Sequence, residues 1–304
     1  MGSGKFDSNT YRAYASSTVG KSTDQVFTQR HLHKDLDPKG VKVRESRDST
    51  DNPKSTPIIV ALDVTGSMGM LADAIAREGL GTLFNSILDR KPVTDPHVMF
   101  MAIGDARSDE YPLQVSQFEA DNRIVQQLSQ IYLEGNGGGN DSESYNFPWY
   151  FAGFRTVHDS FEKRGKRGYL FTVGDECAPD NLTCDQIEQF TGVRPEEEMT
   201  TKEMLEIAER FYDVYHIIIA QGSFASRSLP RVQSTWRELL GQHAITLTDY
   251  KKLAETIVST IEVAEGNTPE AAMGAWADPN TAKIVYEATK HLTAGKGNPK
   301  LLGT

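Results

Sequence analysis

The sequence predicts an α/β protein with a doubly wound, mostly parallel sheet flanked by helices, an irregular N-terminal arm and a helical C-terminal extension. Two observations predict this class. Apolar runs typical of strands buried on both faces alternate with segments of helical periodicity, and two of these runs end in an aspartate. The expected organisation is a polar arm over residues 1–55, the main domain over 56–265, and a helix with a flexible tail over 266–304.

The first half of the main domain contains three predicted strands. Pro57–Asp63 is continuously apolar up to its final carboxylate and should be the central strand. Residues 97–104 repeat this pattern and end next to Asp105, and residues 113–118 fit a short antiparallel edge strand. Between the first two strands we expect a helix over Met68–Asp89, whose apolar stripe is Leu71, Ile75, Leu80, Leu83, Phe84, Ile87 and Leu88.

The next segment contains a helix, a glycine-rich loop, an aromatic helix and a fourth strand. Asp121 should cap the first helix, and the aromatic helix is expected from Ser144 to His158. Within it, Tyr145 and Trp149 are the candidates for exposed contacts. The fourth strand, residues 169–173, leads into Gly174-Asp175-Glu176.

The last segment begins with a long acidic loop over residues 177–200, and such loops are usually functional or mobile. Helices and strands then alternate again. The expected elements are a helix at 202–212, a strand at 214–220, a helix at 228–240 stopped by Gly241, a strand at 244–247, and helices at 250–261 and 280–291.

Composition limits the classes of function. With 38% apolar and 24% charged residues among 304, the chain has ordinary globular usage. Its formal charge of −10 repels phosphate and favours cations and basic partners, so nucleic acid is not an expected ligand. No apolar run approaches the ~20 residues of a membrane helix, and no charged-then-apolar leader opens the chain. Two cysteines, Cys177 and Cys184, fit a reducing cytoplasm.

Polar side chains cluster at the expected carboxyl edge of the sheet, where ligands of open α/β sheets bind. Asp63-Val-Thr65-Gly-Ser67 follows the first strand and places a carboxylate and two hydroxyls at alternate positions of a tight turn. Asp175 follows the fourth strand, and Asp141 lies in the glycine-rich loop. Oxygen ligands without His or Cys suit Mg²⁺ or Mn²⁺ rather than Zn²⁺. The sequence therefore predicts a divalent-cation site.

These residues resemble the von Willebrand factor A (vWA) domain family with its metal-ion-dependent adhesion site, in its bacterial or phage intracellular type. That pattern is Asp-x-Ser-x-Ser after the first strand, a Thr in a glycine-preceded loop, and an Asp ending the fourth strand. Asp63, Thr65 and Ser67 match the first part with Thr for one Ser, and Asp175 matches the last, although Gly174 stands where a Thr is common. The resemblance covers about 210 residues.

The glycine-rich loop departs further from the family pattern. Gly137-Gly-Gly-Asn140-Asp141 is similar to variant vWA loops in which Gly-Gly-Gly-Asp replaces the glycines and the Thr. Asp141 is therefore the expected loop ligand, with Asn140 as the alternative. An added carboxylate makes the site more negative and weakens its attraction for a partner's carboxylate. The resemblance therefore supports metal binding better than it supports adhesion-type binding.

The resemblance implies a Rossmann-like vWA fold in which the first and fourth strands are adjacent. It implies that Thr65 and Ser67 ligate the metal directly, that Asp63 and Asp175 act mainly through bound water, and that a partner's acidic side chain completes the octahedron. The implied function is a protein-binding module without intrinsic chemistry, working in a multiprotein assembly. Family members in bacteria and phages often work beside MoxR-type AAA+ ATPases, so such an ATPase is an expected partner.

Two other functions fit parts of the same sequence. In a haloacid-dehalogenase-like phosphatase, Asp63 would be the nucleophile, while Asp175 and Asp180 would hold Mg²⁺. That chemistry needs a general acid two residues after the nucleophile, where this chain has Thr65, which is a poor proton donor near neutral pH. The other alternative is a structural or assembly protein with a degenerate vWA fold, which should tolerate loss of the metal-site residues.

Overall fold

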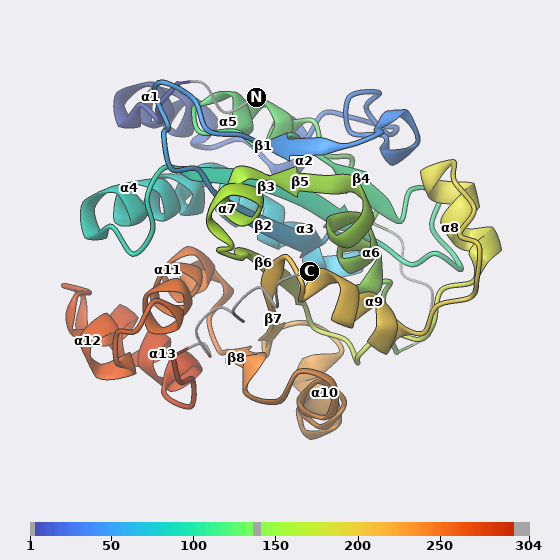
Figure 1. Ribbon diagram of the computed structural model, residues 1–304. Coiled ribbons are helices and arrows are strands. Elements are labelled where there is room, and N and C mark those ends of the chain that lie inside the picture. The colour runs from blue at the N-terminus through green and yellow to red at the C-terminus, as the bar shows by residue number, and fades with distance from the viewer. Residues whose placement is uncertain (1–3, 136–140, 295–304) are drawn as a thin grey trace.

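A mixed six-stranded sheet forms the centre of the computed structural model, which describes residues 4–135 and 141–294 (Figure 1). Five strands are parallel, and β4 pairs with β3 in the antiparallel direction. The spatial order is β4-β3-β2-β6-β7-β8. The strands are β2 (Thr56–Asp63), β3 (Pro96–Ile103), β4 (Leu113–Val115), β6 (Gly168–Gly174), β7 (Tyr212–Ile219) and β8 (Ala244–Leu247).

Helices cover both faces of this sheet, and alternate residues of β2 face different cores. Ile58, Val60 and Leu62 belong to one apolar cluster, whereas Ile59 and Ala61 belong to the other. The first face is covered by α3 (Gly69–Ala74), α4 (Leu80–Arg90), α5 (Arg123–Ser129) and α11 (Leu253–Ala264). The second is covered by α6 (Asn146–Arg155), α8 (Cys184–Thr191), α9 (Thr201–Ala208) and α10 (Ala225–Leu240).

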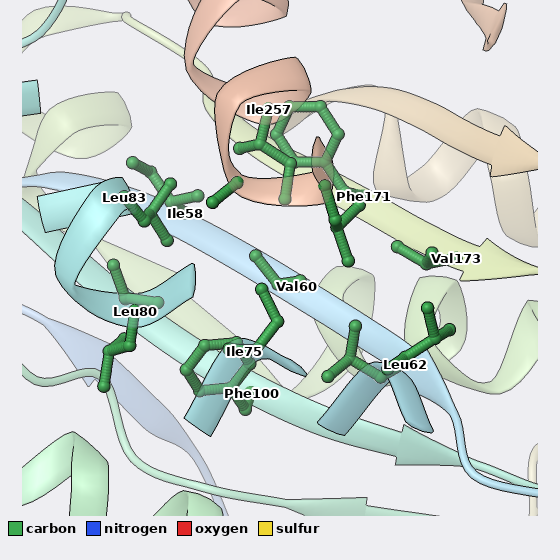
Figure 2. Packing of buried hydrophobic residues seen from close by; sticks show 14 of the residues in the cluster. Ile58, Val60, Leu62, Ile75, Leu80, Leu83, Phe100, Phe171, Val173 and Ile257 are labelled. Carbon is green, nitrogen blue, oxygen red and sulfur yellow. The ribbon is translucent and has the colours of Figure 1, made fainter. Parts of the chain in front are cut away.

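Burial on both faces explains why the central strands are continuously apolar in sequence. Figure 2 shows Leu80 and Leu83 of α4 and Ile257 of α11 close to Ile58 and Val60 of β2. Every residue of β2, β3 and β6 is buried. The predicted α/β class and its buried central strands are confirmed.

The single helix expected over residues 68–89 is divided. A 3₁₀ turn, η2 (Gly66–Met68), leads into α3, and a π-helical turn, η3 (Ile75–Gly79), connects α3 to α4. A Cβ on Gly81 would lie 2.4 Å from the ring of Tyr11, so the missing side chain lets the N-terminal segment pack closely. Leu88 is 41% exposed, so its predicted place in the buried stripe is wrong. It lies eight residues after Leu80, at the margin of the apolar face.

The N-terminal arm was expected to be irregular, and its described residues contain regular elements. These are α1 (Ser8–Thr18), α2 (Thr23–Val26), a 3₁₀ turn η1 (Pro38–Gly40), and β1 (Arg44–Ser46). Strand β1 pairs in parallel with β5 (Thr156–His158) in a separate two-stranded sheet. Phe6 stacks on Phe84 of α4 with ring centroids 4.5 Å apart, and Phe27 and Leu36 are buried in the same cluster. Packing on the main sheet therefore orders this segment.

Other boundaries also differ from expectation. The acidic segment 177–200 contains α8, and the predicted aromatic helix ends at Arg155 because the chain then forms β5. Asn122, not Asp121, is the N-cap residue of α5. Helix α10 is kinked at Ser228 and ends at Leu240, where Gly241, with a φ of +58°, is the C-cap residue. The remaining elements are α7 (Asp159–Arg164), the 3₁₀ turns η4 (Gly241–His243) and η5 (Tyr250–Lys252), α12 (Pro269–Gly274) and α13 (Pro279–Thr289).

Across residues 4–135 and 141–294, no helix has the length and apolar character needed to cross a membrane. The tail beyond residue 294, which was expected to be flexible, lies outside the described residues.

Candidate functional site

The carboxyl ends of three neighbouring strands bring acidic residues to one edge of the sheet. Asp63, the last residue of β2, pairs with Ile103 at the end of β3 and lies beside β6, where Leu62 pairs with Val173. Asp175 directly follows β6. The chain order reverses between β2 and β6, and this is the position where open α/β sheets form ligand crevices.

Asp63 and Thr65 form a closed hydrogen-bonded turn. The Oδ1 atom of Asp63 accepts the backbone N–H of Thr65 at 2.9 Å and the hydroxyl of Thr65 at 2.7 Å. Asp63 is fully buried and Thr65 is 6% exposed. Because the hydroxyl proton of Thr65 points to the carboxylate, the oxygen lone pairs remain available to a cation. Ser67 lies in the turn η2, and its side chain is outside the described part of the structure.

Tyr145 holds the second oxygen of Asp63. Its hydroxyl donates to Oδ2 of Asp63 at 2.8 Å, and its ring packs edge-on against His216 and Trp236 with centroids 5.0 and 5.4 Å away. Tyr145 and Trp149 are both fully buried, so the expectation that they form exposed contacts is wrong. Sequence reasoning missed this role because a helix that is aromatic on all sides has no amphipathic pattern to indicate its buried face.

The position of Tyr145 also explains why residue 174 is a glycine. A Cβ added to Gly174 would lie 2.1 Å from the Tyr145 hydroxyl, so a threonine at this position would displace the tyrosine. The departure from the vWA pattern at Gly174 and the hydrogen bond to Asp63 are therefore linked in space.

Asp175 is held against the start of α10. Its Oδ2 atom accepts the backbone N–H of Phe224 at 2.7 Å, and its Cβ would lie 2.2 Å from a Cβ added to Gly222. Burial raises the pKa of Asp175, and hydrogen bonds from the N–H groups of Phe224 and Ala225 oppose that rise. Asp175 thus reaches the predicted edge, but one of its oxygens also anchors the α10 segment.

Asp141 has a different environment from the one expected of a loop ligand. Its carboxylate forms an ion pair with Arg231 of α10 and is 43% exposed, and its carbonyl accepts the N–H of Cys177 at 2.9 Å. The guanidinium group already balances its charge. Asn140, the alternative ligand, lies outside the described residues.

Glu143 and Glu176 were not assigned a role from the sequence. Glu143 is 2% exposed, and burial together with the negative charges of Asp63 and Glu176 raises its pKa to about 10. Burial and the charges of Asp63 and Asp175 raise the pKa of Glu176 to about 8. Within the described residues, the Oε2 atoms of both glutamates are buried without a hydrogen-bond partner.

Burial and neighbouring negative charge also raise the pKa of Asp63. Burial raises its pKa to about 7, the hydrogen bonds from Thr65 and Tyr145 oppose this rise, and the charge of Asp175 adds to it. In the part of the chain that is described, no Lys or Arg forms an ion pair with Asp63, Glu143 or Glu176. Buried carboxylates without a counter-charge favour a bound cation.

The donor set fits a site that relies on hydroxyl groups as well as carboxylates. Among residues 4–135 and 141–294, no three His, Cys, Asp or Glu side chains lie close enough to hold a metal ion by themselves. A cation at this edge therefore needs oxygens of the kind that Thr65 presents, with carboxylates supporting them. Mg²⁺ and Mn²⁺ accept such mixed oxygen and water shells.

Comparison with known proteins gives distant structural matches. No protein-family model and no curated protein matches this chain. Two crystal structures of the pilus adhesin SpaC from Lactobacillus rhamnosus GG are similar in structure. The first has 9% identity and a TM-score of 0.45 and covers 72% of this chain and 32% of the adhesin. The second, an open conformation, has 10% identity and a TM-score of 0.43, covering 72% and 31%. The chain spans about a third of the adhesin's length.

Proposed function

We propose that this chain is a divalent-cation-dependent protein-binding module with a doubly wound vWA-type sheet. Thr65 and Ser67 would ligate Mg²⁺ or Mn²⁺ directly. Asp63 and Asp175 would interact with the ion mainly through bound water. The strand order, which reverses between β2 and β6 and has one antiparallel edge strand, supports this reading.

The observation that carries the proposal is the turn between Asp63 and Thr65. One carboxylate oxygen accepts both the N–H and the hydroxyl of Thr65, at 2.9 and 2.7 Å. This arrangement fixes the hydroxyl with its lone pairs unused, so little reorganisation is needed when a cation arrives. Glu143 and Glu176 add buried, unpaired carboxyl oxygens at the same edge, and a bound cation would stabilise their ionised forms.

The same geometry argues against the phosphatase alternative. A nucleophilic carboxylate needs one accessible oxygen, whereas Asp63 is fully buried and both of its oxygens accept hydrogen bonds. Asp180, the other expected Mg²⁺ ligand of that enzyme, is 67% exposed and paired with Arg107 at 2.8 Å. We therefore propose binding without catalysis.

The proposed ligand is a protein. As in the vWA family, an acidic side chain of the partner would complete the coordination of the ion, and a MoxR-type AAA+ ATPase is the candidate companion in a larger assembly. Cys177 and Cys184, both free and buried, suit a reducing cytoplasm as the place of action.

Two substitutions at Thr65 test the proposal. Thr65→Val removes the hydroxyl and keeps the shape, whereas Thr65→Ser keeps the hydroxyl. Calorimetric titration with Mn²⁺ should show binding by the natural chain and by Thr65→Ser, and at least ~10-fold weaker binding by Thr65→Val. Equal affinity in all three chains, or none in the natural chain, would contradict the proposal.

Affinity purification from native lysate, with and without EDTA, adds the partner to this test. Capture that is lost with EDTA and with Thr65→Val supports cation-dependent recruitment. Capture that survives both treatments would instead support the structural or assembly alternative, because that role needs no metal.

A further inference from the structure

Glu143 lies in a short segment that is fixed to the carboxyl ends of two strands. The next residue, Ser144, donates its N–H to the carbonyl of Gly104 after β3 at 3.1 Å, and its hydroxyl accepts the N–H of Ala106 at 2.9 Å. Two residues after Glu143, the Tyr145 hydroxyl bonds Asp63 at the end of β2. These contacts place Glu143 at the same edge of the sheet as Asp63.

The carboxyl group of Glu143 is not satisfied by the described protein atoms. The residue is 2% exposed, and its buried Oε2 atom has no hydrogen-bond partner within residues 4–135 and 141–294. An ionised carboxylate at this oxygen needs a donor or a cation, and a protonated one needs an acceptor for its O–H. Burying either form unpaired is costly, so this oxygen indicates an absent ligand.

The neighbouring carboxyl groups favour a cation as that ligand. Asp63 is the carboxylate that acts most strongly on Glu143, followed by Glu176, Asp109 and Asp105. Like charges in a buried site repel one another, and a nearby divalent cation offsets that repulsion.

We propose that Glu143 is a direct ligand of the cation at the Asp63–Thr65 turn and supplies the loop carboxylate that Asp141 was expected to supply. This inference rests on the proposed function. Asp141 is already paired with Arg231, whereas no Lys or Arg of the described residues forms an ion pair with Glu143. A carboxylate oxygen is a ligand that both Mg²⁺ and Mn²⁺ accept.

A small cavity next to Glu143 offers a second place for an ion, but it is too small for a hydrated one. The cavity measures about 10 Å³, about the room for one water, and Arg107 and Asp180 help to line it. Asp105 also lines it, and the carboxylate of Asp180 is already paired with the guanidinium of Arg107 at 2.8 Å. We therefore place the cation on the Asp63 side of Glu143.

The test uses Glu143→Gln, which keeps the size of the side chain and removes its charge. The matched control is Asp180→Asn, which makes the same change at a carboxylate that lines the small cavity and is 67% exposed. Both variants, the natural chain and Thr65→Val are titrated with Mn²⁺ and melted with Mn²⁺ or EDTA. We expect Glu143→Gln to weaken Mn²⁺ binding at least ~10-fold and Asp180→Asn to change it less than about 2-fold.

The melting data separate a ligand from a structural residue. With EDTA, Glu143→Gln should melt at a higher temperature than the natural chain, because an unpaired buried acid is gone, and Mn²⁺ should raise its melting temperature less. A variant that melts lower under both conditions and binds Mn²⁺ normally would overturn the inference. If Glu143→Gln does not fold, Glu143→Asp replaces it: weaker Mn²⁺ binding supports the inference, and unchanged binding overturns it.

Failure of this inference differs from failure of the proposed function. If Thr65→Val loses Mn²⁺ while Glu143→Gln binds as the natural chain does, the site stands and Glu143 is not its ligand. If the natural chain binds no Mn²⁺, both proposals fall. If Asp180→Asn weakens binding as much as Glu143→Gln, the ion lies in the small cavity and the assignment to the Asp63 side is wrong.

Discussion

The hydroxyl of Tyr145 donates a hydrogen bond to Oδ2 of Asp63 across 2.8 Å, while Thr65 donates two hydrogen bonds to Oδ1. Both oxygens of a fully buried carboxylate are thus fixed by neighbouring groups. A carboxylate held in this way acts through the groups it orients, and here it orients the Thr65 hydroxyl. Tyr145, at the start of α6, connects the aromatic core to the candidate site.

Tyr145→Phe should destabilise the protein by about 1–3 kcal/mol, because it removes a donor from the buried carboxylate of Asp63 and leaves the ring packing in place. Urea denaturation measures the change in the free energy of unfolding. The matched control is Tyr286→Phe, whose hydroxyl bonds Glu270 at the surface, and it should leave that free energy nearly unchanged. Equal effects at the two tyrosines would show that the Asp63 bond is not important for stability.

Gly174→Ala should cost about 1–3 kcal/mol of stability, because the new Cβ would lie 2.1 Å from the Tyr145 hydroxyl and force the ring away from Asp63. The control is Gly274→Ala, at a helical position where a Cβ meets no atom within 4 Å. That variant should be neutral or slightly more stable. Thermal melting of both variants checks the prediction, which fails if Gly174→Ala melts at or above the natural temperature.

Asp48 should make stability depend on pH in the acid range. Burial acts to raise its pKa, but hydrogen bonds from Arg164 and Ser55 outweigh burial and lower the pKa to about 2. Since the folded pKa lies below the unfolded value of about 3.9, this stabilisation is complete above about pH 4 and disappears as the pH falls through 2. Asp48→Asn should therefore melt lower than the natural chain at pH 6, with the difference vanishing near pH 2.

The control for this pH dependence is Asp51→Asn, at an exposed position three residues further on. Its melting temperature should follow that of the natural chain at every pH. A constant offset between Asp48→Asn and the natural chain from pH 6 to pH 2 would contradict the assignment, because a lost carboxylate interaction must fade once that carboxyl is protonated.

The strands could be predicted because a strand that is buried on both faces of a sheet is a continuous apolar run in the sequence. The expected strand at 244–247 coincides with β8, and the apolar run ending at Asp63 is β2. Helices α1 and α8 are among those that were not predicted. In each case a local signal was present: Asp7 accepts the N–H groups of Asn9 and Thr10 at the start of α1, and Thr183 with Gln186 forms a capping box before α8.

At the candidate site, short-range contacts follow from the motif, whereas long-range contacts do not. The bonds between Asp63 and Thr65 join residues two positions apart, so the motif itself specifies them. The partner of Asp141 is Arg231, 90 residues further along the chain, and nothing near Asp141 in sequence indicates that pair. The burial of Glu143 is equally hidden, because a glutamate in a polar loop is normally exposed.

The stack of Phe6 on Phe84 also affects how the chain can be shortened. Shortened versions that begin at residue 56, where the polar composition ends, would uncover Phe84 and the ring-sized gap that Gly81 leaves for Tyr11. The apolar surface exposed on α4 would promote aggregation, even if the sheet itself still folds. Recombinant fragments intended for binding assays should therefore retain the sequence from Phe6 onward.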